Sequence, residues 1–355
     1  MTRPPSCQRH LLQFDRGSQG QLREATHELA IVVPRAMSKV VVTGAFSYTG
    51  RYLTHLLLER GHTVVNLTNH PGRAHGFSPA QLSRIATHPL DFSRPDELAR
   101  ALEGADQLVC TYWIRFAGVG GDSHDAAAAR LAGLWELARA AGVRKVLFTS
   151  HTRATESSPY AYIAGKARAA AALRASGVES YAIARPCGVF GDTAGESILM
   201  NNAAWVLRRT PLFLLAGDGD HRFQPVHVRD FAQLLLELGA SDARAEERDA
   251  CGPDAPRSRE LFGAIARAVG SRALVAAPGL STRAVTTLTR PLDWVTGDTL
   301  LDEDDLDLLC SGLTVADDPD DPAIAARRSL LAWLAEVGPS LGQEYANSMV
   351  RYYKK

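Results

Sequence analysis

A tyrosine and a lysine four residues apart could carry acid–base chemistry in this chain. Tyr162 and Lys166 lie in a segment of helical pattern, so they share one face and stand one turn apart. A lysine ammonium beside a phenol favours the phenolate and lowers the pKa of the tyrosine from about 10 toward neutrality. Such a tyrosine can pass a proton to or from a substrate oxygen while a hydride moves to or from a nicotinamide. A hydroxyl of Ser150 or Thr149, at the end of the preceding strand, could orient the same oxygen. Because Tyr-x-x-x-Lys pairs also arise by chance, this interpretation depends on where the pair stands in the fold.

A glycine turn near residue 44 predicts where a nucleotide would bind. The apolar run 40–42 leads into Thr43–Gly50, a helical pattern follows over 51–60, and 64–67 resembles a second strand. Strand, glycine turn, helix and strand form the first half of a mononucleotide-binding unit, in which a pyrophosphate sits on the helix N-terminus. The alternative is a plain βαβ core without a ligand. The turn residues expected against a dinucleotide are Gly44, Phe46, Ser47, Tyr48, Thr49 and Gly50.

The end of the second strand bears on the choice between NAD and NADP. An acidic residue there would bind the ribose 2′-hydroxyl of NAD, and an arginine would accept the 2′-phosphate of NADP. Thr68 and Asn69 are neutral, whereas His70 and Arg73 follow a little later. The sequence therefore predicts NAD(P), with a slight preference for NADP, and places Asn69 at the cofactor.

Strands and helices alternate over the next hundred residues. Further strands are expected near 85–90, 107–110, 145–150 and 181–186, with helices over 95–102, 123–141 and 159–168. This alternation indicates an α/β fold with a doubly wound parallel sheet. The fourth strand ends at Thr111, which is expected at the cofactor, and an aromatic run follows it. These aromatic side chains could line a ligand site at the carboxyl edge of the sheet or cap the sheet as core.

Bulk composition excludes several classes of protein. The 355 residues contain 39 Lys plus Arg and 39 Asp plus Glu, so the net charge is zero, which argues against nucleic acid or an anionic membrane as the main partner. The five cysteines are scattered without metal-ligand spacing, which predicts no metal site and favours a reducing cytoplasm. The sequence contains no run of about 18 apolar residues, so it predicts no membrane span.

Four stretches together resemble the short-chain dehydrogenase/reductase superfamily, most of all its extended and atypical branches, which contain epimerase/dehydratase-like and NmrA-like proteins. They are Thr43–Gly50, Tyr162–Lys166, Arg185–Gly191 and Gly217–Ala232. The resemblance implies that Tyr162 is the catalytic tyrosine and that Lys166 holds the nicotinamide ribose. The remaining cofactor contacts that it implies are the pyrophosphate against Gly44 and Gly50, the adenine near Asp91, and the nicotinamide near Pro186.

Three positions depart from the pattern of that superfamily. Ser47 replaces the middle glycine of the turn, His151 stands near the usual catalytic Ser or Thr, and Arg130 occupies a helix position that is usually asparagine. Each is compatible with nucleotide binding. Since atypical members often keep the cofactor and lose the full catalytic set, two functions are expected as alternatives. One is an NAD(P)-dependent oxidoreductase or epimerase/dehydratase-like enzyme acting on a small carbonyl or hydroxyl substrate, and the other is an NAD(P)-binding regulatory or scaffold protein without turnover.

The chain divides into three parts by its patterns. Residues 1–36 resemble a mostly disordered extension before a natural start at Met37, or a transit peptide. Residues 37–190 are expected to form the Rossmann domain. Residues 191–355 are expected to form a small C-terminal α/β substrate lobe that returns to the Rossmann domain around 217–240. A monomer or homodimer is expected.

Overall fold

The computed structural model describes residues 37–348 except 75, 116, 119–121 and 300–301. The extension predicted for residues 1–36 lies outside this part of the chain. No helix among the described residues is both long and apolar enough to cross a membrane.

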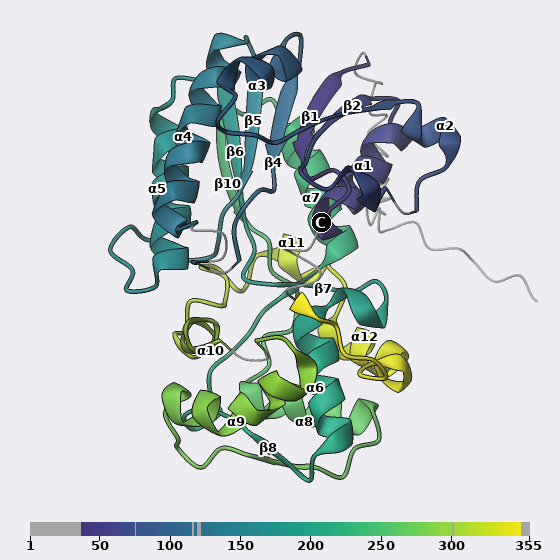
Figure 1. The fold of residues 1–355 in the computed structure, drawn as a ribbon, viewed down its shortest axis with the longest axis vertical. Coiled ribbons are helices and arrows are strands. Elements are labelled where there is room, and N and C mark those ends of the chain that lie inside the picture. Colours follow the sequence, from purple (N-terminus) through teal and green to yellow (C-terminus); the bar gives the residue numbers. More distant parts are fainter. Residues whose placement is uncertain (1–36, 75, 116, 119–121, 300–301, 349–355) are drawn as a thin grey trace, which may run out of the picture. The chain divides into compact units, whose positions relative to one another are not determined.

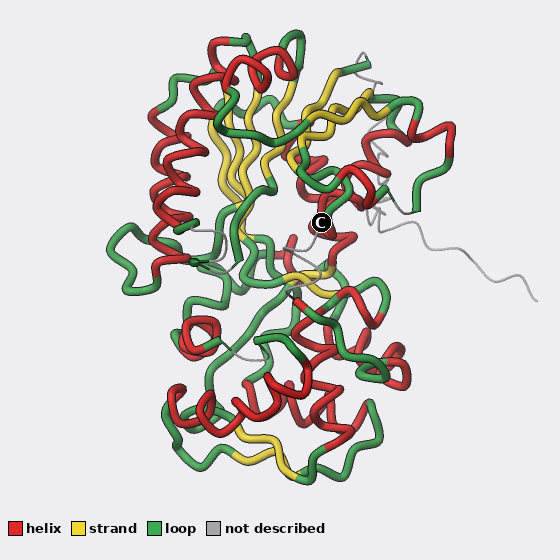
Figure 2. The backbone as a smooth tube through the Cα atoms, viewed as in Figure 1, coloured by secondary structure: helices red, strands yellow, loops and turns green. Residues whose placement is uncertain are grey.

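Seven parallel strands form the central sheet, which confirms the doubly wound α/β fold (Figure 2). Their order across the sheet is β10-β6-β5-β4-β1-β2-β3. The six strands of the alternating region were expected, but β10 was not, because its sequence Ala-Glu-Glu-Arg-Asp lacks an apolar pattern. It pairs with β6 at the edge of the sheet. The strands are β1 Lys39–Thr43, β2 Thr63–Leu67, β3 Ile85–His88, β4 Gln107–Cys110, β5 Lys145–Thr149, β6 Ser180–Arg185 and β10 Ala245–Asp249.

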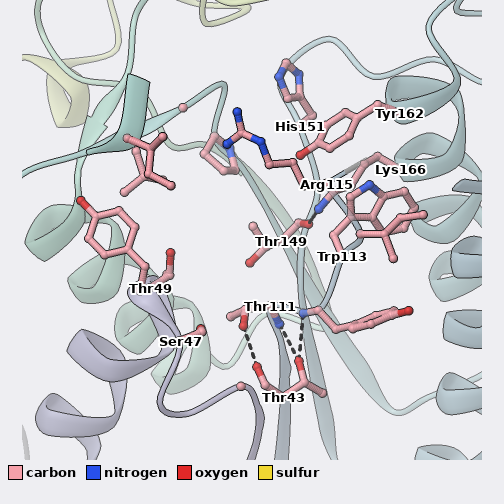
Figure 3. Close-up of a pocket in the computed structure, with 18 of the residues that line it drawn as sticks. Thr43, Ser47, Thr49, Thr111, Trp113, Arg115, Thr149, His151, Tyr162 and Lys166 are labelled. Carbon is pink, nitrogen blue, oxygen red and sulfur yellow. Dashed lines mark hydrogen bonds between the residues drawn. The ribbon is translucent and has the colours of Figure 1, made fainter. Parts of the chain in front are cut away.

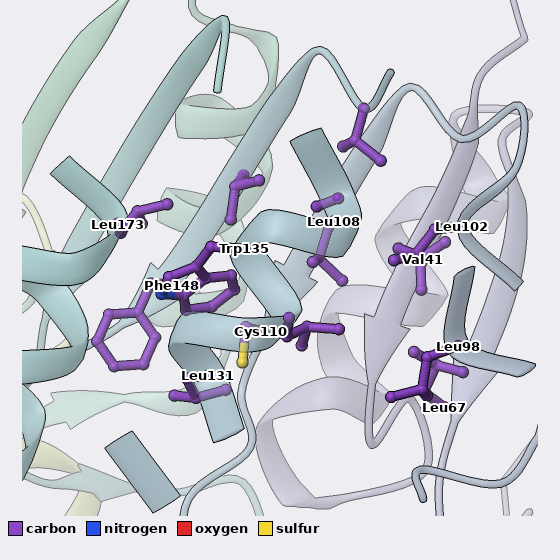
Figure 4. Close-up of a cluster of buried hydrophobic side chains, with 14 of the residues drawn as sticks. Val41, Leu67, Leu98, Leu102, Leu108, Cys110, Leu131, Trp135, Phe148 and Leu173 are labelled. Atoms are coloured by element: carbon purple, nitrogen blue, oxygen red, sulfur yellow. The ribbon is translucent and has the colours of Figure 1, made fainter. Parts of the chain in front are cut away.

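Helices cover both faces of the sheet, so the inner strands are buried on both sides. One face packs against α3 (Pro95–Leu102), α4 (His124–Ala140) and α5 (Ala161–Ala175). Figure 4 shows this core, in which Trp135 and Phe148 are fully buried with their rings 5.6 Å apart.

The opposite face packs against α1 (Tyr48–Glu59) and α7 (Val228–Ala240), as Figure 1 shows. Val40 and Val42 of β1 point to this face, whereas Val41 between them points to the other. Helix α7 belongs to the segment that the sequence predicted to return from the lobe, and β10 continues that return.

Helix α2 (Pro79–Leu82) lies between β2 and β3 in the chain, and most of the other elements form the C-terminal lobe beyond the carboxyl ends of the strands (Figure 1). Its core contains the buried side chains of Leu330, Trp333 and Leu334. The sequence did not predict α9 and α10. The lobe consists of β7 Val189–Phe190, α6 Ile198–Arg209, β8 Leu212–Leu214, β9 Val226–His227, α8 Ser258–Ala268, β11 Leu274–Ala276, α9 Thr282–Thr296, α10 Glu303–Cys310, α11 Pro322–Ala325 and α12 Leu330–Val337.

The backbone geometry of the turn between β1 and α1 explains which of its positions are glycine. Gly44 has a φ of 73°, which glycine adopts without strain, and its N–H donates to the Leu67 carbonyl. Gly50 lies so close to this turn that a Cβ atom on it would be 2.0 Å from the Gly44 carbonyl oxygen. Ser47, at a φ of −72°, needs no glycine, and its hydroxyl accepts a hydrogen bond from the Gly50 N–H as the N-cap of α1. The missing middle glycine is therefore compatible with this turn.

We predict that Gly50→Ala destabilises the fold because the added methyl group must displace the Gly44 backbone. Overpacking of this kind costs about 1–3 kcal/mol. Gly133 in α4 has nothing within 4 Å of the same added atom, so Gly133→Ala should stabilise by about 0.5–1 kcal/mol. Urea unfolding of both variants tests the contrast, and equal effects would contradict it.

Candidate cofactor and substrate site

A cavity of about 1120 Å³ runs along the carboxyl edge of the sheet, between the sheet and the C-terminal lobe (Figure 3). Its volume slightly exceeds the roughly 300–1,000 Å³ of a site for one drug-sized ligand, so it has room for a dinucleotide and a small substrate. Gly50 is absent from its lining, because it is buried against Gly44. Twelve residues predicted for the site line the cavity: Gly44, Phe46, Ser47, Tyr48, Thr49, Asn69, Asp91, Thr111, Ser150, Tyr162, Lys166 and Pro186.

One end of the cavity lies at the ends of β2 and β3. The Asn69 side-chain amide donates to the Leu90 carbonyl at 3.0 Å, which ties the two strand ends together. Asp91 accepts hydrogen bonds from the Ser93 hydroxyl and N–H, and these bonds lower the pKa of its carboxyl. Arg73 also lines this end. The lining after β2 therefore includes the Arg73 guanidinium and the Asn69 amide. No acidic residue stands at the end of β2 itself.

Threonines join the ends of β1 and β4 beneath the cavity. The Thr43 hydroxyl accepts from the N–H groups of Thr111 and Tyr112 at 2.9 and 3.0 Å, and the Thr111 hydroxyl donates to the Thr43 carbonyl at 2.6 Å (Figure 3). These bonds hold the loop after β4 over the glycine turn. Thr111, expected at the cofactor, thus lies on the cavity wall beside Gly44.

Lys166 is buried at the base of the cavity. Its Nζ donates to the Thr149 carbonyl at 2.5 Å and lies 4.8 Å from the centre of the Trp113 ring and 5.9 Å from that of Tyr162. Burial lowers the pKa of its ammonium to about 7. At neutral pH the group therefore stands near its midpoint and can exchange its charge with small changes in its surroundings.

Tyr162 lies among aromatic rings on the wall above Lys166. Its ring meets those of Trp113 and His151 edge to face, with centroids 6.1 and 6.0 Å apart. The His151 Nδ1 lies 2.8 Å from the Thr152 carbonyl, and burial lowers the pKa of its ring to about 4. The ring is thus neutral at pH 7.

Three buried polar atoms around this cavity have no hydrogen-bond partner within the described part of the chain. They are Trp113 Nε1, Thr149 Oγ1 and His151 Nε2. Buried polar groups are normally hydrogen-bonded, and such exceptions call for a ligand, water or function. The sequence predicted a role for Thr149 or Ser150 at this position, and the structure adds His151 and Trp113, whose proximity only the fold creates.

The C-terminal lobe closes the cavity on the side opposite the sheet. Arg115 donates to Asp305 at 3.1 Å and so connects the loop after β4 to α10. Arg130 forms an ion pair with Asp122 at 2.6 Å and lines the same cavity. The sequence did not predict that residues of α10 line the cavity, because a short acidic stretch is not typical of a ligand-binding site.

Comparisons with known proteins support the nucleotide-binding interpretation of this cavity. Residues 44–205 match the model of an NAD(P)H-binding family. Together with the fold, the match supports the resemblance to the extended short-chain dehydrogenase/reductase superfamily.

Solved structures share the fold over most of the chain. An NADPH-dependent quinone oxidoreductase from Escherichia coli, complexed with NADPH, is 19% identical with a TM-score of 0.64, and the match covers 84% of this chain and 99% of that one. A triphenylmethane reductase from Citrobacter sp., complexed with NADP(H), is 13% identical with a TM-score of 0.67 and the same coverage. A nucleoside-diphosphate-sugar epimerase from Staphylococcus aureus is 14% identical with a TM-score of 0.63 and again the same coverage.

One curated relative is similar in sequence over part of its length. It is the mitochondrial NADH dehydrogenase [ubiquinone] 1 alpha subcomplex subunit 9 of Dictyostelium discoideum, 27% identical over 205 residues. The match covers 56% of this chain and 54% of that relative, so the chain spans about half the length of the relative.

The residues of the cavity fit an NAD(P) dinucleotide. The turn at Gly44 and the N-terminus of α1 lie at one part of the wall, where a pyrophosphate would meet backbone N–H groups. Lys166 and the unpartnered Thr149 hydroxyl lie at another part, where a ribose and a nicotinamide would find hydrogen-bonding groups.

We predict that Lys166 makes the stability of the protein depend on pH above neutrality. An exposed lysine has a pKa of about 10.4, so between pH 7 and 10 the unfolded chain binds more protons at this site than the folded one. The free energy of unfolding should therefore rise with pH across this window. In Lys166→Met this rise should disappear, as followed by urea unfolding at pH 7, 8, 9 and 10.

Arg168 on the same helix provides the control for this measurement. Its side chain is 37% exposed, whereas Lys166 on the same helix is buried. Arg168→Met should keep the pH dependence of the wild type. A Lys166→Met protein with an unchanged pH dependence would contradict the assignment.

Proposed function

We propose that this protein is an NAD(P)H-dependent reductase of small carbonyl compounds, with Tyr162 as its acid. The observation that carries the proposal is the position of Tyr162 one helical turn from the buried Lys166, on the wall of the cavity that begins at the nucleotide-binding turn. The bound cofactor would supply the hydride. The chain's own residues would bind the nucleotide, orient the carbonyl and deliver the proton.

Each residue of the site has a defined task in this mechanism. Lys166 would hold the nicotinamide ribose, and its Nζ lies 5.9 Å from the centre of the Tyr162 ring. The Tyr162 hydroxyl donates a proton to the substrate oxygen as the carbon is reduced. The Ser150 hydroxyl orients the same oxygen, and the neutral His151 ring supports the Tyr162 ring edge to face. The reverse direction, oxidation of an alcohol, uses the same groups.

The preference for NADP rests on Arg73. This residue lines the cavity near Asn69, at the position where a guanidinium can meet a 2′-phosphate. No acidic side chain follows β2 at the place where NAD-binding proteins of this fold hold the ribose.

A second candidate function is nucleotide binding without turnover, in a regulatory or scaffold role. The curated relative is named as a subunit of a larger assembly, and His151 and Arg130 depart from the usual catalytic pattern. A cytoplasmic location and a monomeric or homodimeric state remain proposals under either function.

We predict that Tyr162→Phe reduces reductase turnover by at least about 100-fold, the usual scale for loss of a general acid. Cofactor affinity should change by less than about threefold, because the ring and its packing remain. Calorimetric titration with NADPH and stopped-flow hydride transfer over a panel of ketones measure the two effects. An unchanged rate would eliminate Tyr162 as the acid, and tight binding with no transfer in the wild type would favour the second candidate.

We predict that Arg73→Ala weakens NADPH binding by about 10-fold or more and leaves NADH binding nearly unchanged. A charge-assisted hydrogen bond to a phosphate contributes about 1.5–3 kcal/mol, and NADH lacks this phosphate. NADH serves as the internal control in the same calorimetric experiment. Parallel losses for both nucleotides would place Arg73 outside the cofactor-selecting contacts.

A further inference from the structure

We propose that the substrate is an uncharged, predominantly apolar ketone of about aryl size, and that the C-terminal lobe excludes anionic substrates such as nucleotide sugars. This inference rests on the proposed reductase function and deepens it. It is carried by the composition and charge of the wall that the lobe contributes to the cavity.

The lobe wall is mostly apolar. The described residues that the lobe contributes between positions 196 and 314 comprise seven apolar side chains, three carboxylates, two threonines and a serine, with no Lys, Arg or His. Helix α10 supplies three leucines, and the start of α6 supplies three apolar side chains in a row. The apolar members are Ile198, Leu199, Met200, Phe223, Leu306, Leu308 and Leu309.

The charged groups on this wall already have partners. Glu196 pairs with Arg51, and Asp305 pairs with Arg115 across the cavity. Asp302 is the N-cap of α10, where its carboxylate accepts from the N–H groups of Asp304 and Asp305. The lobe wall therefore adds negative charge to the cavity and no cation of its own.

The cationic side chains on the other walls also have partners or lie at the other end of the cavity. Arg115 and Arg130 are paired with Asp305 and Asp122, and Lys166 is buried with its Nζ on the Thr149 carbonyl. Arg73 lies at the opposite end, near Asn69. Among the described lining residues, the arginine that contacts the lobe is Arg115, and its guanidinium is already paired with Asp305 of α10.

Physical chemistry then favours an uncharged ligand at this wall. An anion placed against leucine side chains and carboxylates would lose hydration without gaining an ion pair. An apolar body gains from the removal of its surface from water, at roughly 25 cal/mol per Å². Near Tyr162, the cavity wall carries the Trp113 ring and two polar atoms without a partner, on His151 and Thr149. These two atoms could hydrogen-bond one carbonyl or hydroxyl group of a ligand.

The reaction balances with the cofactor of the proposed function. The ketone carbon gains a hydride and its oxygen gains a proton, so the product is a secondary alcohol. NAD(P)H supplies the hydride and leaves as NAD(P)⁺, and Tyr162 supplies the proton, which it regains from solvent.

A matched pair of ketones tests the inference. The probes are 2-acetylnaphthalene, which is uncharged, and 6-acetyl-2-naphthoate, which carries one carboxylate on the same ring system. Binding of each to the full-length protein with saturating NADP⁺ is measured by calorimetry, and turnover is followed by the loss of NADPH absorbance. The wild type should bind the uncharged ketone at least about tenfold more tightly.

A charge introduced on the lobe wall should narrow this preference. Leu199 is the second residue of α6, is 37% exposed and lines the cavity. Leu199→Arg should improve binding of the naphthoate relative to the uncharged ketone by about fivefold, as expected for an exposed ion pair. Leu331 is the second residue of α12, is 43% exposed and does not line the cavity, so Leu331→Arg should leave the ratio unchanged.

Each outcome separates the inference from the function on which it rests. Equal or tighter binding of the naphthoate by the wild type overturns the inference even if turnover occurs. A preference for the uncharged ketone without any hydride transfer supports the inference on ligand class and contradicts the reductase function. If neither ketone binds up to its solubility limit, or if Leu331→Arg shifts the ratio as much as Leu199→Arg, the assignment of the lobe wall is wrong.

Discussion

The close contact between Gly50 and the Gly44 carbonyl is the constraint on which the cavity depends. A Cβ atom on Gly50 would lie 2.0 Å from that oxygen, so the first helix can approach the end of β1 only with glycine here. This approach sets the N-terminus of α1 against the carboxyl edge of the sheet, where the cavity begins. Ser47 then completes the turn as a helix cap. Tyr162, Lys166 and the lobe wall line the same cavity as this turn.

The opposite end of the site depends on a lysine placed where charge is unfavourable. Lys166 is buried between Trp113 and Phe148, and its Nζ donates a hydrogen bond to the Thr149 backbone carbonyl. Folding therefore retains a group whose charged form is disfavoured, and this is typical of a functional site. The neutral His151 nearby and the unpartnered Thr149 hydroxyl have the same character. Together these groups favour a site that is completed by a ligand.

The C-terminal lobe bears on the choice of substrate, which the fold alone does not determine. Solved structures of the same fold, under 20% identical, include proteins named as quinone, triphenylmethane dye and nucleotide-sugar enzymes, so the fold does not select a substrate. We propose that the selection lies in the side chains of α6 and α10, which are apolar or acidic where they line the cavity. The Arg115–Asp305 pair joins this wall to the loop after β4, so the wall and the nucleotide domain form one cavity.

The sequence by itself determined the parallel sheet, the nucleotide turn and the Tyr162–Lys166 pair, because these depend on local patterns: apolar strands, glycines at fixed spacing and a helical period. It could not determine β10, whose polar residues pair only because β6 offers a free edge. Nor could it identify Gly50 as a packing residue, the buried environment of Lys166, or the wall made by α10. Each of these arises from contacts between residues far apart in the chain, such as Arg115 with Asp305. Burial, charge pairing and the resulting pKa shifts are properties of those contacts, so only the tertiary structure decided them.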